Sequence, residues 1–125
     1  RYHLMQHALA SLEHDPAHGV SWMIVPKDRY EEVEASSEDL EGFVDIPRSI
    51  EGTEVGLLFR LTTSGDVKIS FRSNGLVDVN LLARSFKGGG HVKASGALVS
   101  GPMEEAVPRV VDAARAAVDG MRTIA

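Results

Sequence analysis

The chain has 125 residues, of which 43% are hydrophobic and 25% charged, with a formal net charge of −5 and no cysteine. This length suits a single domain with a real hydrophobic core, and the average composition excludes disordered, collagen-like and coiled-coil proteins. The lack of cysteine excludes a disulfide scaffold and thiolate metal sites and favours a cytoplasmic protein, while the acidity argues against a dedicated duplex-DNA binder. No apolar run is long enough for a membrane span, and the start at Arg1, without an initiator methionine, suggests a piece of a longer or processed protein.

The first half of the chain predicts one buried strand among helical segments. Apolar residues at helical spacing indicate a helix that stops before Pro16, because the residue preceding a proline avoids the helical conformation. A continuous apolar run indicates the strand, and serines followed by acidic residues indicate a capped helix, with Pro47 and Gly52 in the loop after it. The predicted elements are a helix over 1–13, a strand over 20–25, a short helix or turn over 27–34 and a short helix over 37–43.

The clearest local pattern is a β-hairpin in the middle of the chain. Residues 54–62 and 67–72 predict two strands, joined by turn residues over 63–66. Successive side chains of a strand point to opposite faces, so the second strand has an apolar and a polar face. The apolar face holds Val67, Ile69 and Phe71, and the polar face holds Lys68, Ser70 and Arg72.

The last third of the chain predicts a helix, a strand and a second helix. Asp78 can cap the first of these helices, and a connector over 87–91 leads to the strand over 97–100. The final helix is expected to begin near residue 107, because Pro108 is not tolerated deep inside a helix. Together the elements predict an α/β fold, with a mixed β-sheet and helices packed on it.

Charge is distributed unevenly along the chain. Residues 1–62 contain twelve acidic and five basic side chains, whereas residues 63–125 contain six acidic and eight basic ones. A locally cationic segment over 66–100 inside an acidic chain favours an anion-binding site over a surface coated with nucleic acid. A chance distribution of charges explains the same numbers, so the charge pattern alone leaves both interpretations open.

The chain lacks a recognisable catalytic or metal-binding cluster. His3 and His7 have the spacing of two metal ligands on one helix face, but the glutamate of a metalloprotease motif is missing between them. With His14, Asp15 and His18 they form a histidine-rich stretch, which we interpret as solvated side chains. Neither an Asp-His-His triplet nor an Asp-x-Asp pair occurs, so we expect no catalytic residue and no metal ligand in this chain.

The glycine run followed by His91 carries the strongest chemical signal. Three consecutive glycines leave the backbone bare, so that their N–H groups can converge on an anion, and a neighbouring histidine can donate to a phosphate or stack on a base. A flexible turn is the alternative for the glycines alone. An arginine near a strand end, serine hydroxyls and a polar helix start are the further parts of a phosphate pocket. These parts are Ser70, Arg72, Ser73, Asn80, Gly88, Gly89, Gly90 and His91.

The run from Val67 to Gly96, with its S-x-R-S, D-V-N and G-G-G-H elements, resembles the C-terminal DHH-associated domain of DHH-family phosphoesterases. Within that family it is most similar to the bifunctional oligoribonuclease and phosphoadenosine-phosphate phosphatase branch, also called nanoRNase. The resemblance implies the DHH-associated fold, with a linker and packing helix over 1–18 and a substrate-binding domain over 19–125. This sequence departs from the family pattern at two positions. Lys87 stands where many relatives have a fourth glycine, and Pro108 is unusual within the final helix.

The resemblance also implies roles and partners. Ser70, Arg72 and Ser73 would grip a substrate phosphate, Asn80 would stand at the helix start, and the loop Gly88–His91 would face the catalytic cleft. The implied partners are short RNA or phosphoadenosine phosphate and an N-terminal DHH catalytic domain with two manganese ions; no membrane partner is expected, and a homodimer is left open. This chain by itself would then bind substrate without hydrolysing it.

Two alternatives come from other classes within the same superfamily. One is a non-catalytic RNA-binding module like that of alanyl-tRNA synthetases, and the other is the corresponding domain of a cyclic-dinucleotide phosphodiesterase. The acidic total charge disfavours a large RNA partner. The sequence does not separate the phosphoesterase substrates from one another.

Overall fold

The computed structural model describes residues 2–25 and 37–124, and it describes side chains from residue 6 to 25 and from 42 to 124. The described elements follow the order α1 (Tyr2–Ala10), β1 (Glu13–Asp15), β2 (Val20–Val25), α3 (Ser37–Ser49), β3 (Val55–Leu61), β4 (Val67–Ser73), α4 (Val79–Arg84), β5 (Gly89–Gly90), β6 (Ala94–Val99) and α5 (Met103–Ile124).

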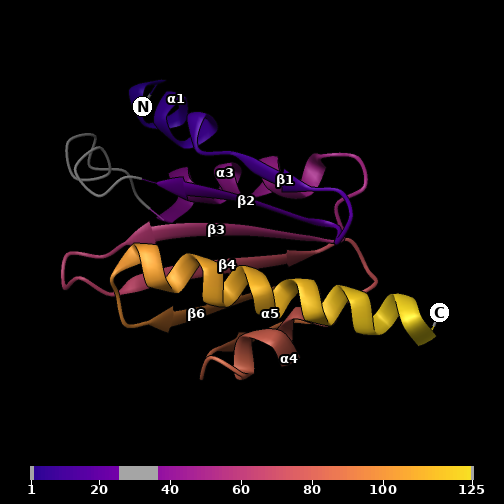
Figure 1. The fold of residues 1–125 in the computed structure, drawn as a ribbon. Helices are drawn as coiled ribbons and strands as arrows, with labels where there is room; N and C mark the ends of the chain where they lie inside the picture. Colours follow the sequence, from indigo (N-terminus) through magenta and orange to yellow (C-terminus); the bar gives the residue numbers. More distant parts are fainter. Residues whose placement is uncertain (1, 26–36, 125) are drawn as a thin grey trace.

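The described strands form one mixed sheet of six strands in the order β1-β2-β3-β4-β6-β5. Strands β2 and β3 pair in parallel, and every other neighbouring pair is antiparallel. Helix α5 runs across one face of this sheet, while α3 lies behind the strands (Figure 1). The predicted α/β class, with a mixed sheet and packed helices, is therefore confirmed.

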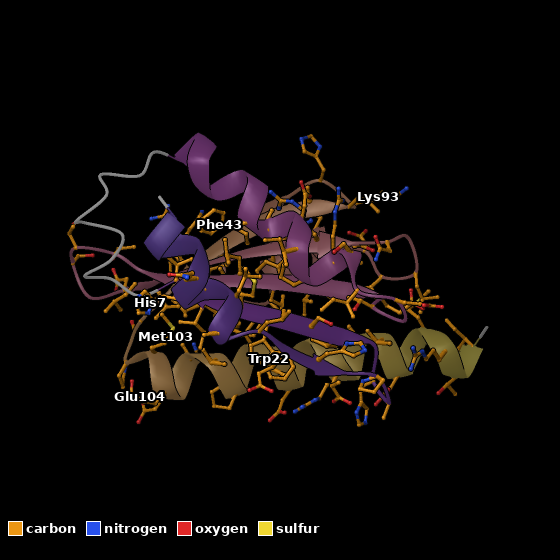
Figure 2. The ribbon with its side chains drawn as sticks, turned by 90° about the horizontal axis from the view of Figure 1, so that it is seen from above. His7, Trp22, Phe43, Lys93, Met103 and Glu104 are labelled. Carbon is orange, nitrogen blue, oxygen red and sulfur yellow. The ribbon has the colours of Figure 1, made fainter. Side chains whose placement is uncertain are left out.

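The sheet separates two hydrophobic cores. The larger core lies between the strands and the helices α4 and α5, and Phe59 and Phe71 are fully buried in it. The smaller core lies on the other face, where Phe43 of α3 and Ala8 of α1 pack against Met23 of β2. Seen from above, Phe43 lies on the side of α1 and α3, and Trp22 lies over α5 (Figure 2). Each burial removes apolar surface from water, which is the main force that holds the layers together.

The elements that the structure describes cover the second face of the sheet only in part. Helix α3 packs so closely on β3 that a Cβ atom at Gly56 would lie 2.7 Å from the backbone nitrogen of Arg48. Farther along the same face the side chains of β4 and β6 are half-buried, and Leu98 is 53% exposed. We call this part the open sheet face; it consists of Lys68, Ser70, Arg72, Ala94, Gly96 and Leu98.

Several local predictions are confirmed. Strand β2 has the predicted bounds, and the predicted hairpin appears as β3 and β4 with seven paired positions. In β4 the burial alternates strictly, so that the apolar side chains face the larger core and Arg72 lies on the other side. The carboxylate of Asp78 caps α4, because its Oδ1 atom accepts from the backbone N–H of Asn80 at 2.9 Å and of Leu81 at 3.3 Å.

Other local predictions are wrong. The first helix ends at Ala10, and the residues after it form β1, which pairs with β2. Helix α3 continues through Pro47 to Ser49, because its apolar residues pack on the sheet and one lost hydrogen bond near the helix end is tolerated. The last strand begins at Ala94 and gains β5 as a neighbour. The helix or turn predicted over 27–34 lies outside the described residues.

The final helix also begins earlier than predicted, at Met103 instead of near 107. Pro108 is the sixth residue of α5, and its ring is exposed to solvent. A proline there removes the hydrogen bond to the carbonyl of Glu104, which is also exposed, so that water can take its place. Pro108, near the start of the helix, therefore destabilises α5 less than the sequence pattern suggested.

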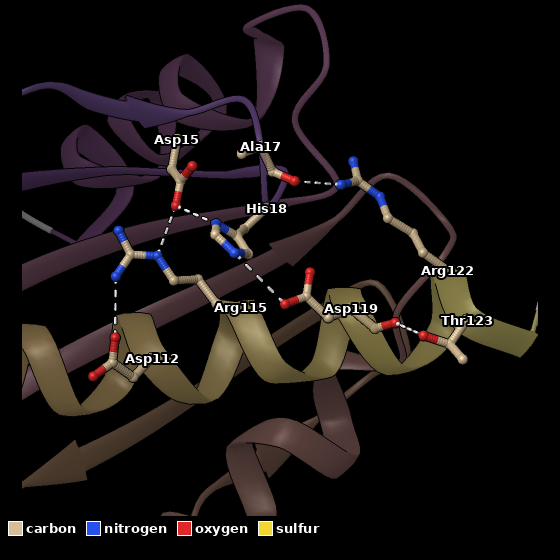
Figure 3. A network of polar contacts seen from close by, with 8 residues as sticks. All are labelled: Asp15, Ala17, His18, Asp112, Arg115, Asp119, Arg122 and Thr123. Carbon is tan, nitrogen blue, oxygen red and sulfur yellow. Dashed lines mark hydrogen bonds and ion pairs between the residues drawn. The ribbon is translucent and has the colours of Figure 1, made fainter.

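Polar contacts fasten the turn between β1 and β2 to α5 (Figure 3). Arg115 Nε donates to Asp15 Oδ2 at 2.7 Å, and His18 Nδ1 lies 2.9 Å from the same oxygen. Arg122 donates to the Ala17 carbonyl at 2.9 Å. Partial burial raises the pKa of Asp15, but the hydrogen bonds from Arg115 and His18 outweigh it, so that the net pKa lies below its ordinary value.

The lowered pKa makes this link pH-dependent. An aspartate whose pKa is lower in the folded state stabilises the fold above its unfolded pKa and loses that effect as the pH falls through the folded pKa. We expect Asp15→Asn to lower the Tm at about pH 7 and the difference from the unmodified chain to shrink below about pH 4. Thermal melts followed by circular dichroism test this. Asp112→Asn, an exposed partner of Arg115, is the matched control, and a difference that stays constant with pH would contradict the ion-pair role.

The backbone after α4 has a conformation at position 87 that favours glycine, although this chain has a lysine there. The N–H of Gly88 donates to the Ala83 carbonyl at 2.9 Å, and the N–H of Lys87 donates to the Arg84 carbonyl at 3.0 Å. These two bonds form a Schellman motif, whose turning residue adopts a left-handed conformation that favours glycine. Lys87 occupies this position with φ of 64°.

We therefore expect Lys87→Gly to stabilise the chain by about 1 kcal/mol, because glycine has no Cβ to strain in the left-handed region. Urea unfolding measures the change. Lys87→Ala removes the same ammonium group and keeps the Cβ, so it should bring no comparable gain. Equal stabilisation by both variants would show that charge, and not backbone conformation, is responsible.

Candidate functional site

Two segments that are far apart in the sequence meet on the open sheet face. Ser70 pairs with Gly96, which pairs in turn with Gly89, so the three lie in one row across β4, β6 and β5. Arg72 pairs with Ala94 in the next row. The register therefore brings the predicted strand-end residues beside the predicted glycine segment, across a strip of β6 that carries almost no side chain.

The guanidinium of Arg72 is available to an anion. Its side chain is half-buried, and Nη1 donates to the carbonyl of Phe71 at 2.9 Å. Within the described residues no carboxylate lies within 4.0 Å of it. Because a guanidinium has five N–H donors, most of them remain for a ligand such as a phosphate.

Ser73 lies elsewhere, although it is adjacent to Arg72 in the sequence. It is the last residue of β4 and its side chain is on the core face, 1% exposed. Its hydroxyl accepts from the N–H of Gly75 at 3.0 Å, and its own N–H donates to the carbonyl of Lys93 at 2.9 Å. The structure thus brings Ser70 and Arg72 together but directs the Ser73 side chain away from them, where it shapes the turn after β4.

Asn80 contacts the glycine segment directly. Its Oδ1 atom accepts from the N–H of Gly90 at 3.0 Å. The bare backbone is also a packing requirement, since a Cβ at Gly88 would lie 2.1 Å from the Gly96 carbonyl and one at Gly90 would lie 2.7 Å from the Ala94 carbonyl. The glycine run is therefore closely packed on β6, which argues against the flexible-turn alternative.

His91 stands at the tip of the hairpin between β5 and β6. Its N–H donates to the Ala94 carbonyl at 2.8 Å, and its carbonyl accepts from Ser95 Oγ at 2.7 Å, while the imidazole is exposed. The tip is fixed to α4 by the bond from the Val79 N–H to the Val92 carbonyl at 2.9 Å. In Figure 2 the neighbouring Lys93 lies on the α3 side of the sheet, away from α5.

The sequence-based site omitted Lys68 and Gly96. A Cβ at Gly96 would lie 3.1 Å from Lys68 Nζ, so the ammonium group lies across the bare strand beside Ser70. Alternation along β4 already placed Lys68 on the face of Ser70 and Arg72 and was the signal that could have identified it. The position of the ammonium over Gly96 depends on the β4–β6 register, which the sequence does not reveal.

The assembled site gathers groups that suit an anion. Lys68 and Arg72 provide positive charge, Ser70 provides a hydroxyl, and His91 provides an exposed ring at the rim. Among the described residues, no three histidine, aspartate or glutamate side chains gather in a way that could hold a metal ion. His14 and His18 instead bond to Ser21 and Asp15, at 2.7 and 2.9 Å.

No helix in the described part of the chain is long and apolar enough to span a bilayer. Comparison with known proteins then relates the chain to several others. Its sequence is 40% identical, over 81 residues, to the bifunctional oligoribonuclease and PAP phosphatase NrnA of Thermus thermophilus. That match covers 64% of this chain and 25% of the relative, so the matched region spans about a quarter of that protein's length.

Solved structures show the same fold. An exopolyphosphatase-related protein from Bacteroides fragilis superposes with a TM-score of 0.85 at 32% identity, over 97% of this chain and 36% of that one. A pGpG-specific phosphodiesterase from Vibrio cholerae gives a TM-score of 0.59 at 10% identity, over 95% and 38% of the two chains. The C-Ala domain of Aquifex aeolicus alanyl-tRNA synthetase gives 0.53 at 15%, over 77% and 90%. These last two likenesses concern the fold alone.

A family model for the DHHA1 domain matches residues 23–120, which include β3, β4, the glycine segment and nearly all of α5. The matched region therefore contains the whole open sheet face and the residues around it. The chain belongs to the DHHA1 domain family.

Proposed function

We propose that this chain is the substrate-binding domain of a DHH-type phosphoesterase that acts on short RNA oligonucleotides or on phosphoadenosine phosphate. The observation that carries the proposal is the convergence of Lys68, Ser70 and Arg72 with the bare glycine segment on the open sheet face. The name of the Thermus relative, an oligoribonuclease and PAP phosphatase, supports this substrate class. A cytoplasmic location belongs to the same proposal.

Each group has a role in holding a nucleotide. Arg72 binds one phosphate through two parallel N–H donors, which suits the geometry of a phosphate better than a point charge does. Lys68 adds a second cation, and the Ser70 hydroxyl adds a neutral donor. The N–H groups of Gly88 and Gly90 already donate to Ala83 and Asn80, so these glycines contribute an open backbone surface and no free donors. His91 donates to the phosphate or stacks on the base. Asn80 and Ser73 do not contact the ligand in this proposal. Asn80 holds the glycine segment and Ser73 holds the turn after β4.

In this proposal a separate DHH catalytic domain carries out the hydrolysis. A DHH domain with two manganese ions would activate the attacking water. The described residues of this chain do not fit such a pair of ions, because they include no suitable cluster of ligands. This chain would therefore bind the phosphate, orient the nucleotide and present it to the catalytic domain.

The binding role predicts a strong effect of Arg72→Ala. Charge-assisted hydrogen bonds contribute about 1.5–3 kcal/mol, so we expect the Kd for phosphoadenosine phosphate to rise by roughly 10- to 100-fold. His91→Ala should weaken binding less, because its ring stands at the rim. Isothermal titration measures both, with Arg122→Ala at the end of α5 as control. Unchanged binding by Arg72→Ala would refute the site, and a steep salt dependence would favour a large RNA ligand instead.

If this chain binds the substrate and a separate DHH domain hydrolyses it, the chain alone should have no manganese-dependent hydrolase activity. We expect it to leave a diribonucleotide intact when manganese is added, because no described residues can hold the ions. Chromatography of the reaction products measures this. Addition of EDTA provides the control for contaminating nucleases. Turnover that persists in purified protein and disappears with EDTA would show that the chain contains a metal site of its own.

A further inference from the structure

A second concave site lies where β6 ends, on the far side of the glycine segment. It is a groove of about 490 Å³ between the residues after α4, the end of β6 and the first turns of α5. Its walls include Phe86 and Lys87 on one side, Leu98 and Ser100 on another and Arg109 on the third. Of these residues, only Leu98 is also part of the open sheet face.

Arg109 is held in a stack of rings. Phe71 and Phe86 stack with ring centroids 6.4 Å apart and an interplanar angle of 26°. The guanidinium carbon of Arg109 lies 5.8 Å from the centroid of Phe86. Such a cation–π contact orients the planar guanidinium, and the exposed side of that plane offers a surface on which a base can stack. Among the described residues no carboxylate pairs with Arg109.

Charge and apolar surface complete the groove. Lys87 is exposed at its rim, and among the described residues it has no acidic partner either. Leu98 is 53% exposed and presents its apolar side chain to the groove. A positive charge, an oriented guanidinium plane and an apolar side chain together suit a ligand with a flat base and a phosphate.

The groove is continuous with the open sheet face. Leu98 belongs to both, since it pairs with Lys68 across the strands and lines the groove. It follows Gly96 by two residues, which along a strand is roughly 7 Å. A single-stranded chain whose first phosphate lies over Gly96 would thus reach the groove with its next nucleotide.

We propose that this groove is a subsite for the second nucleotide of a short single-stranded RNA. This inference rests on the proposed function, because it extends the ligand that the open sheet face would hold. The base of the second nucleotide stacks on Arg109 and contacts Leu98, and the phosphate that precedes it lies near Lys87. The subsite would make the domain prefer oligonucleotides over mononucleotides.

Titrations with two probes test the proposal. The probes are adenosine 5′-monophosphate and the 5′-phosphorylated adenosine dinucleotide, each titrated into the unmodified chain and its variants. We expect the unmodified chain to bind the dinucleotide about 10-fold more tightly. Arg109→Ala should remove this preference and leave mononucleotide binding within about 2-fold, whereas Arg72→Ala should weaken both.

Two further variants distinguish stacking from charge and from misfolding. Arg109→Lys keeps the charge but loses the plane, so it should lose most of the preference. Arg122→Ala removes the same charge from the same helix, about 20 Å away, and should leave the preference for the dinucleotide unchanged. Circular dichroism melts show whether each variant folds.

The outcomes separate the two proposals. Binding of both probes with equal affinity, or a preference that survives Arg109→Ala, would overturn the subsite and leave the proposed function intact. Binding of neither probe by the unmodified chain would overturn the proposed function, and the subsite with it.

Discussion

The close contact between the glycine segment and β6 is the constraint on which the rest of the site depends. The backbone of Gly88 comes so near to the Gly96 carbonyl that any side chain on it would overlap that oxygen. This contact brings the end of α4 against the sheet edge, forms β5 and sets the position of the hairpin tip. The local packing therefore depends on the same glycines that, in the proposed function, lie beside the ligand.

Much of the fold could be predicted from local patterns, because those patterns have short-range causes. Alternation in residues 67–72 predicted the two faces of β4, and Asp78 predicted the start of α4. The elements β1 and β5 are too short for any periodicity to show. The helix bounds predicted from Pro47 and Pro108 were wrong. How much a proline destabilises a helix depends on packing and solvent exposure, which cannot be inferred from the residue type alone.

Less of the candidate site than of the fold could be predicted from the sequence. Ser70 and Arg72 could be grouped by alternation, which would also have separated Ser73 from them, since adjacent residues of a strand point to opposite faces. The row that joins Ser70 to Gly96 and Gly89 depends on pairing between distant strands. The same holds for Lys68, whose ammonium lies over Gly96 only because that residue has no side chain. The left-handed backbone of Lys87 could not be predicted from its residue type, because lysine rarely adopts that conformation.

The unequal cores have a consequence for local unfolding. The core beneath α5 contains most of the described buried side chains, whereas the core beneath α1 and α3 is small. Opening the layer of α1 and α3 therefore exposes less apolar surface than global unfolding does, and hydrogen exchange in this layer should report a lower free energy of opening. Because α3 packs beside the open sheet face, such partial opening would widen the approach to that face while the glycine segment stays in place.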